Sequence, residues 1–102
     1  MAKGFKKVAF RRAEGGSLQG RINTTYARLV KVFGQPNSKG DGYKVDVQWI
    51  LQAGPGVIVT IYNWKDGKNY LGKEGLAVSR IRDWHIGGET KGVVNLIRAA
   101  LG

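Results

Sequence analysis

Three segments of this 102-residue chain place basic side chains beside aromatic rings. An aromatic ring offers a stacking surface to a nucleobase, and a nearby lysine or arginine attracts its phosphate. From these segments and the strand before them we predict phosphate contacts from Lys44, Lys65, Arg80 and Arg82. We predict base stacking or hydrogen bonding from Asn63, Trp64, Tyr70 and His85. The same pattern also fits a core position for Trp64 and a solvated strand edge for the two arginines.

Catalytic and metal chemistry find little support in the sequence. The single histidine, His85, follows Asp83 by two residues, a spacing that can orient a general base, but no nucleophile motif accompanies the pair. One histidine, no cysteine and scattered carboxylates do not form the usual zinc set, and the Asp66–Asn69 loop lacks the carboxylates of a calcium loop. We therefore predict a non-enzymatic protein with no catalytic residue, no metal site and no cofactor.

The net charge of +10 indicates an anionic partner. Half of it lies in residues 1–12, within a segment at 1–16 that forms a basic N-terminal arm or an edge strand ahead of a body at 17–102. The arm's basic residues are Lys3, Lys6, Lys7, Arg11 and Arg12. Such an arm is typical of nucleic-acid binding but also of a solvated tail, and the sequence leaves both interpretations open.

The chain length predicts one domain over residues 1–102. No apolar run is long enough for a membrane span, and no apolar region of a signal peptide follows the basic start. We therefore expect a cytoplasmic protein that has no contact with a membrane.

Periodicity predicts an α+β fold. A short strand at 6–12 and a second at 17–22 are expected to pair across a turn at 13–16. Apolar residues at helical spacing predict a helix from Thr24 to Phe33, with Gly34 and Pro36 ending it. A second helix is expected after Glu89. The expected architecture is an antiparallel sheet of about four to five strands with two helices packed on one face.

The clearest hairpin joins strands at 43–52 and 57–65 through the turn at 53–56. If Gln52 faces Val57, then Trp49 and Tyr62 share the apolar face under the helices. A Gly-rich loop at 66–77 follows. The next predicted strand, 78–86, places Arg80 and Arg82 on one face about 7 Å apart, a separation that suits a phosphodiester.

Several blocks together resemble a family of small accessory proteins of tailed bacteriophages. The most specific are the FGQP block at 33–36, the IYNWK block at 61–65 and the DWHIGG block at 83–88, within a similarity that covers about residues 18–100. The helix–FGQP–strand–strand segment is also similar to the repeat unit of beta-lactamase inhibitory proteins, which implies helices layered on an antiparallel sheet.

The phage resemblance implies an infected bacterial host as the setting and a role against host defence. The leading hypothesis is a non-enzymatic anti-defence protein that sequesters a phosphate-bearing ligand, with a (cyclic) nucleotide immune signal as the first candidate, in a homo-oligomer. One alternative is a basic phage protein that binds DNA or RNA through the arm and the same basic face. Another is an anti-CRISPR-like inhibitor that binds a host protein.

Overall fold

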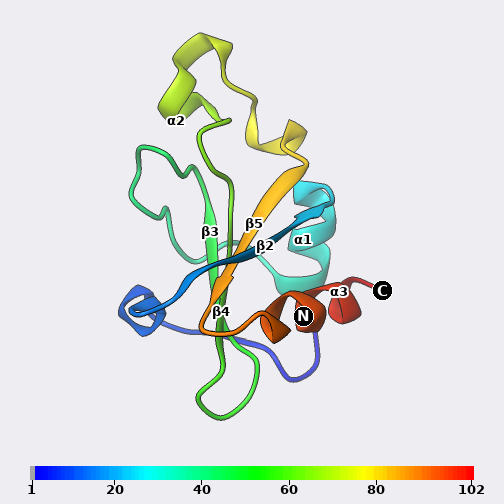
Figure 1. The fold of residues 1–102 in the computed structure, drawn as a ribbon. Coiled ribbons are helices and arrows are strands. Elements are labelled where there is room, and N and C mark those ends of the chain that lie inside the picture. The colour runs from blue at the N-terminus through cyan, green and yellow to red at the C-terminus, as the bar shows by residue number, and fades with distance from the viewer. Residues whose placement is uncertain (1) are drawn as a thin grey trace.

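The computed structural model describes residues 2–102, and five strands form its single antiparallel sheet. The strands are β1 (Lys6–Lys7), β2 (Ser17–Asn23), β3 (Gln48–Gln52), β4 (Ile58–Tyr62) and β5 (Asp83–Gly88). Their order across the sheet is β1-β3-β4-β5-β2 (Figure 1). The predicted α+β class and strand number are confirmed.

Two helices cover one face of this sheet, as predicted. They are α1 (Tyr26–Phe33) and α3 (Gly92–Leu101), and their apolar side chains enter the same core as the rings of Trp49 and Trp84. The helix α1 begins two residues later than expected, because Thr25 is the N-cap and its hydroxyl accepts a hydrogen bond from the Arg28 N–H. Gly34 ends the helix at φ +79°, a conformation that glycine adopts without a steric cost.

The predicted hairpin register is wrong by one residue. Gln52 faces Ile58 instead of Val57, because the Ala53 N–H donates to the Val57 carbonyl and so includes Val57 in the turn. A shift of one residue moves every side chain of a strand to the other face of the sheet. Trp49 therefore shares its face with Ile61, while Tyr62 lies opposite Gln48 on the face without helices.

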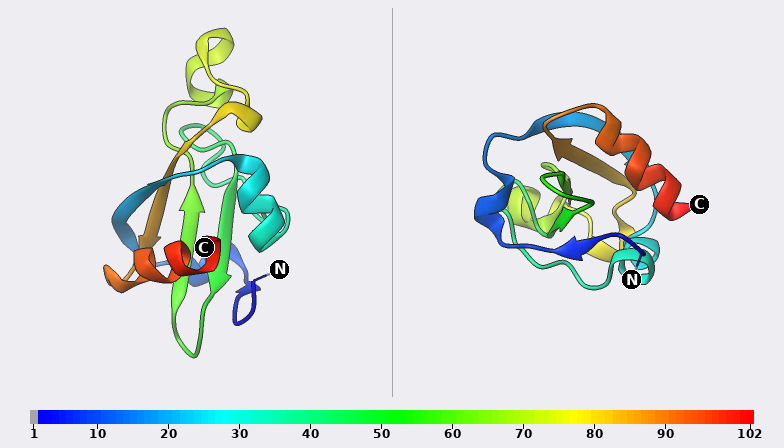
Figure 2. Two further views of the ribbon diagram at one scale, coloured as in Figure 1. Left: turned by 90° about the vertical axis from the view of Figure 1, so that its right-hand side faces the viewer. Right: turned by 90° about the horizontal axis from the view of Figure 1, so that it is seen from below.

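The N-terminal segment also differs from the expected hairpin, because β1 pairs with β3 and β2 pairs with β5. These two strands are the opposite edges of the sheet, so the connection between them crosses the face that α1 and α3 leave open. This connection contains the short 3-10 helix η1 (Phe10–Ala13), which contacts β3 and β4. Figure 2 shows η1 and α3 on opposite sides of the strands.

The basic arm is thus part of the folded body. Phe5 packs edge-on against Phe33 at 5.2 Å between ring centroids, and the Val8 N–H donates to the Ile50 carbonyl at 3.0 Å. The two residues of β1 extend the sheet beyond β3. The predicted strand at 6–12 is therefore real only at its first two residues, and η1 replaces its end.

The predicted loop at 66–77 projects beyond the end of the sheet and carries two short helices. These are α2 (Lys68–Leu71) and the 3-10 helix η2 (Gly72–Glu74) (Figures 1 and 2). A third 3-10 helix, η3 (Val78–Arg80), precedes β5. No helix within residues 2–102 has the length and apolar character needed to cross a membrane.

Candidate functional site

A pocket of about 270 Å³ opens on the helix-free face of the sheet. Its floor comes from β4 and β5, through Thr60, Tyr62, Gly87 and Gly88. Its walls come from the η1 region, through Phe10, and from the loop before β3, through Asp41 and Val45. The crossing of the N-terminal segment over this face is what turns an open sheet surface into a pocket.

Three polar side chains in this pocket lack a protein partner. The amide of Gln48, the hydroxyl of Thr60 and the hydroxyl of Tyr62 make no side-chain hydrogen bond to any residue between 2 and 102. All three residues line the pocket, and their polar atoms are accessible, since no buried side-chain nitrogen or oxygen in this part of the chain lacks a partner. Gln48 and Thr60 are only 8% and 7% exposed, and burial raises the pKa of Tyr62, which keeps its hydroxyl protonated as a donor. These accessible donors and acceptors are the hydrogen-bonding groups that the pocket offers to a polar occupant.

Gly87 shapes the floor of the pocket. A Cβ at this position would lie 2.5 Å from Thr60 Oγ1 and 3.4 Å from Tyr62 Cε1. Only glycine therefore allows both side chains to lie across β5 as they do. The absence of a side chain at Gly87 is thus a structural requirement of the pocket.

Most of the predicted ligand residues gather at one end of the pocket, around Trp64. The Lys44 and Lys65 ammonium nitrogens lie 5.4 and 5.9 Å from the centre of the Trp64 ring, and Lys65 also lies 5.7 Å from the Tyr70 ring. Trp64 also stacks on His85, with 6.2 Å between the ring centroids and an angle of 24° between the ring planes. We call Lys44, Trp64, Lys65, Tyr70 and His85 the Trp64 cluster.

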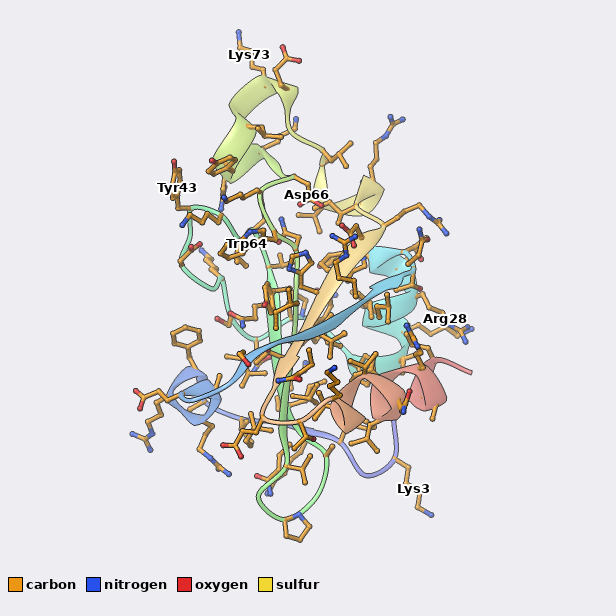
Figure 3. The ribbon with its side chains drawn as sticks, viewed as in Figure 1. Lys3, Arg28, Tyr43, Trp64, Asp66 and Lys73 are labelled. Carbon is orange, nitrogen blue, oxygen red and sulfur yellow. The ribbon has the colours of Figure 1, made fainter. Side chains whose placement is uncertain are left out.

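The loops that carry the cluster are held by backbone hydrogen bonds. One carboxylate oxygen of Asp41 accepts from the N–H groups of Tyr43, Lys44 and Val45 at 2.9–3.0 Å, and these bonds, the one from Tyr43 first, lower the pKa of Asp41. The Lys65 N–H donates to the Lys44 carbonyl at 2.8 Å. Lys65 itself has φ +60°, a conformation that is strained for a residue with a side chain. Figure 3 shows Tyr43 and Trp64 on the same side of the molecule.

Asn63 has a structural role in this arrangement. Its side chain is fully buried, and its oxygen accepts from the N–H groups of Asp46 and Val47 at 2.8 and 3.2 Å. Its nitrogen donates to the carboxylates of Asp46 and Asp66 at 2.9 and 3.1 Å. Both donors and both acceptor positions of the amide are occupied, so Asn63 has no group left for a ligand and is not part of the candidate site.

His85 is buried beneath Trp64, and this burial lowers its pKa. The negative charges of Asp83 and Asp66 raise the pKa of His85, and the positive charge of Arg21 lowers it further. The ring is therefore neutral at pH 7. No group of three or more side chains that could ligate a metal occurs within the described part of the chain.

The predicted strand face with Arg80 and Arg82 does not form. Arg80 ends η3 and β5 begins only at Asp83, because residues 78–80 fold into a helical turn that closes with the Ile81 N–H on the Val78 carbonyl. Both arginines are exposed and neither lines the pocket. Of the basic arm residues, Arg12 alone lines it, and its guanidinium donates to the Gln52 side chain at 3.1 Å.

The residues that sequence reasoning missed are Phe10, Gln48, Thr60, Tyr62 and Gly87. Four of them lie on or beside the face that the wrong hairpin register misassigned, and Tyr62 was expected in the core for that reason. A signal for the two faces was present in the sequence. In 61–64 and in 84–85, residues that belong to the core side alternate with residues that belong to the open side: Ile61, Asn63 and Trp84 on the one, and Tyr62, Trp64 and His85 on the other.

No family model matches this chain, and neither a curated protein nor a solved structure matches it.

Proposed function

We propose that this protein binds a nucleotide, with the base inside the pocket and the phosphate at the Trp64 cluster. The observation that carries the proposal is the set of three unpartnered polar side chains, Gln48, Thr60 and Tyr62, in a pocket lined by aromatic rings. Ligand sites are typically apolar concavities with a small number of such polar groups.

The pocket interior has the chemistry of a base site. Phe10, Tyr62 and Trp64 offer ring surfaces for stacking, a contact that contributes about 1–3 kcal/mol per base. The Gln48 amide carries both a donor and acceptors, as the edge of a nucleobase does. A flat ligand with polar edges would satisfy the three groups that the protein leaves without partners.

The charges favour a phosphate at the rim. Glu14, Asp41 and Glu89 line the pocket, and Arg12 is the one basic lining residue among residues 2–102, so a phosphate inside the pocket would be repelled. Lys44 and Lys65 do not line the pocket, and their ammonium nitrogens lie 5.4 and 5.9 Å from the centre of the Trp64 ring. A base beside Trp64 therefore brings its phosphate close to two ammonium groups.

We extend the proposal to the biological role that the phage resemblance suggests. The protein would hold a nucleotide signal and keep it from its host receptor without converting it. A pocket of 270 Å³ is at the small end for ligand sites, so it suits a single base. A second copy of the chain would supply the second base site if the ligand is a cyclic dinucleotide.

Calorimetry at low salt tests the proposal with the four nucleoside monophosphates, their 3′,5′-cyclic forms and the matching nucleosides. We expect at least one nucleotide to bind and its nucleoside to bind more weakly. Lys44→Gln/Lys65→Gln should weaken nucleotide binding and leave nucleoside binding nearly unchanged. Absence of binding by all of these probes would exclude the proposed function.

A pair of tyrosine variants tests the pocket itself. Tyr62→Phe removes one hydroxyl from the pocket, and we expect it to weaken binding about five- to tenfold, as a lost hydrogen bond does. Tyr26→Phe is the matched control, because its hydroxyl contacts Gln35 away from the pocket. Equal affinities for the two variants would show that the ligand lies elsewhere.

A further inference from the structure

A second group of basic side chains lies on a different part of the molecule. Arg21 comes from β2, Arg28 from α1 and Arg98 from α3, and all three line an open groove of about 570 Å³. Arg82 reaches the same place, since its Nε donates to the side chain of Asn23 at 3.2 Å. Figure 3 shows Arg28 well separated from Trp64. We call Arg21, Arg28, Arg82 and Arg98 the arginine groove.

Most hydrogen-bond donors of this groove are free. Each guanidinium carries five N–H donors, and all four arginines are exposed. Arg28 donates to the Leu101 carbonyl at the end of α3, and Arg98 makes one long bond of 3.5 Å to the Arg21 carbonyl. These contacts orient the side chains and leave most of their N–H groups pointing to solvent.

The groove has little negative charge of its own. Its one ion pair within residues 2–102 joins Arg21 to Asp83 at 3.6 Å, and the two side chains are 63% and 54% exposed. Such exposed pairs contribute little to stability. None of the described residues lining the groove has an acidic side chain. Four arginines therefore face solvent with one acidic side chain, Asp83, paired with them.

We propose that the arginine groove binds the phosphodiester backbone of a nucleic acid. Guanidinium groups form short, charge-assisted hydrogen bonds with phosphate oxygens. The groove is open, and no aromatic residue lines it in the described part of the chain, so its contacts are to the nucleic-acid backbone and not to bases. Binding there is therefore independent of base sequence and of the nucleotide pocket.

Fluorescence anisotropy with a labelled DNA duplex and its single strand tests this site as KCl rises from about 50 to 200 mM. The groove variant is Arg21→Gln/Arg28→Gln/Arg98→Gln. We expect this variant to bind nucleic acid at least about tenfold more weakly at low salt. We also expect the slope of log K against log[KCl] to be smaller in magnitude by about two to three. Comparison of the duplex with the single strand shows which form the groove prefers.

Two variants with the same net charge control for bulk electrostatics. Lys39→Gln/Lys73→Gln/Lys91→Gln removes three exposed lysines elsewhere, and Lys6→Gln/Lys7→Gln/Arg11→Gln removes three charges from the N-terminal arm. We expect both to keep most of the wild-type slope. An equal loss in either one, no binding of nucleic acid by the wild type, or tighter binding of polyglutamate than of nucleic acid would overturn the proposal.

Arg28 also holds the end of α3, so the triple variant requires a folding check by circular dichroism. If it unfolds, Arg98→Gln alone replaces it, because its single hydrogen bond is long. That variant should lower the slope by about one, and an unchanged slope would overturn the proposal. Nucleotide binding in the pocket should be unchanged in every groove variant.

Discussion

The two faces of the sheet use the same kinds of residue in different ways. On the helix side, the rings of Trp49 and Trp84 meet edge-on at 5.6 Å, and both are fully buried. Their indole N–H groups donate to the Gly34 and Thr24 carbonyls at 2.8 and 3.1 Å. On the open side, Tyr62 meets Trp64 at 6.2 Å, but Tyr62 lines the pocket and its hydroxyl makes no hydrogen bond to residues 2–102.

This difference shows that aromatic packing by itself does not identify a binding site. Both faces contain ring clusters of similar geometry, carried in part by the same strand, β5, through Trp84 on one face and His85 on the other. The two faces differ in whether the polar atoms of the rings and their neighbours find hydrogen-bond partners within the protein. The helix side is complete without a ligand, whereas the open side has hydrogen-bonding capacity left over.

The largest expected contrast is between two tryptophans. Trp84→Ala should lower the free energy of unfolding by about 3–5 kcal/mol, because it leaves a cavity and an unpaired Thr24 carbonyl in the core. Trp64→Ala should cost about 1 kcal/mol, since the ring is 38% exposed, but it should abolish nucleotide binding. Urea denaturation followed by circular dichroism measures both. Similar losses would mean that the two faces are equally structural.

A smaller loss of stability is expected when Gly87, on the floor of the pocket, is substituted. Gly87→Ala should lower the free energy of unfolding by about 1–3 kcal/mol, because the new methyl group collides with Thr60. Gly92→Ala is the matched control on α3, where a Cβ meets no atom closer than 3.7 Å. This variant should raise the free energy of unfolding by about 0.5–1 kcal/mol, because alanine favours the helix over glycine.

Nucleotide binding should also differ between the two glycine variants. Gly87→Ala should weaken nucleotide binding, and Gly92→Ala should leave it unchanged. The double variant Gly87→Ala/Thr60→Ala should recover part of the lost stability without recovering affinity, since the Thr60 hydroxyl is then missing. Full recovery of affinity would show that Thr60 makes no contact with the ligand.

Lys65 offers a test in which stability and binding move in opposite directions. Lys65→Gly should raise the free energy of unfolding by up to about 1 kcal/mol, because glycine adopts φ +60° without strain. The same change removes an ammonium group from the Trp64 ring and should weaken nucleotide binding. Lys65→Gln should lose the same affinity without the gain in stability. A loss of stability in Lys65→Gly would mean that the contacts of the lysine side chain outweigh the backbone strain.

Periodicity in the sequence was sufficient to predict the helix side of the fold. The stripe in residues 24–33 and the apolar run after Glu89 placed α1 and α3 because each pattern is local. The Trp64 cluster was also predictable in part, since Trp64 and Lys65 are neighbours at the end of a strand. Tyr70 joins them through a short loop, and the loop geometry follows from hydrogen bonds that no local pattern specifies.

The pocket could not be predicted because it depends on long-range pairing. The register of β3 and β4 depends on the turn, where the Ala53 N–H donates to the Val57 carbonyl and the Val57 N–H donates to the Gly54 carbonyl. An error of one residue in this register exchanged the faces of Tyr62 and Ile61. The wall from Phe10 exists because β1 and β2 take opposite edges of the sheet. The arginine groove combines residues 21, 28, 82 and 98, which come from both ends of the chain.

The smallest expected effect concerns pH and the ring beneath Trp64. Burial holds the pKa of His85 in the folded protein below its ordinary value near 6.5. As the pH falls below that value, the unfolded chain binds the proton first, so the free energy of unfolding decreases toward the lower folded pKa. His85 is the single histidine of the chain, so His85→Phe, which keeps a ring against Trp64, should remove most of this dependence. Urea denaturation of both proteins above and below that pH measures the difference, and parallel pH profiles would show that His85 is as well solvated in the folded state as in the unfolded one.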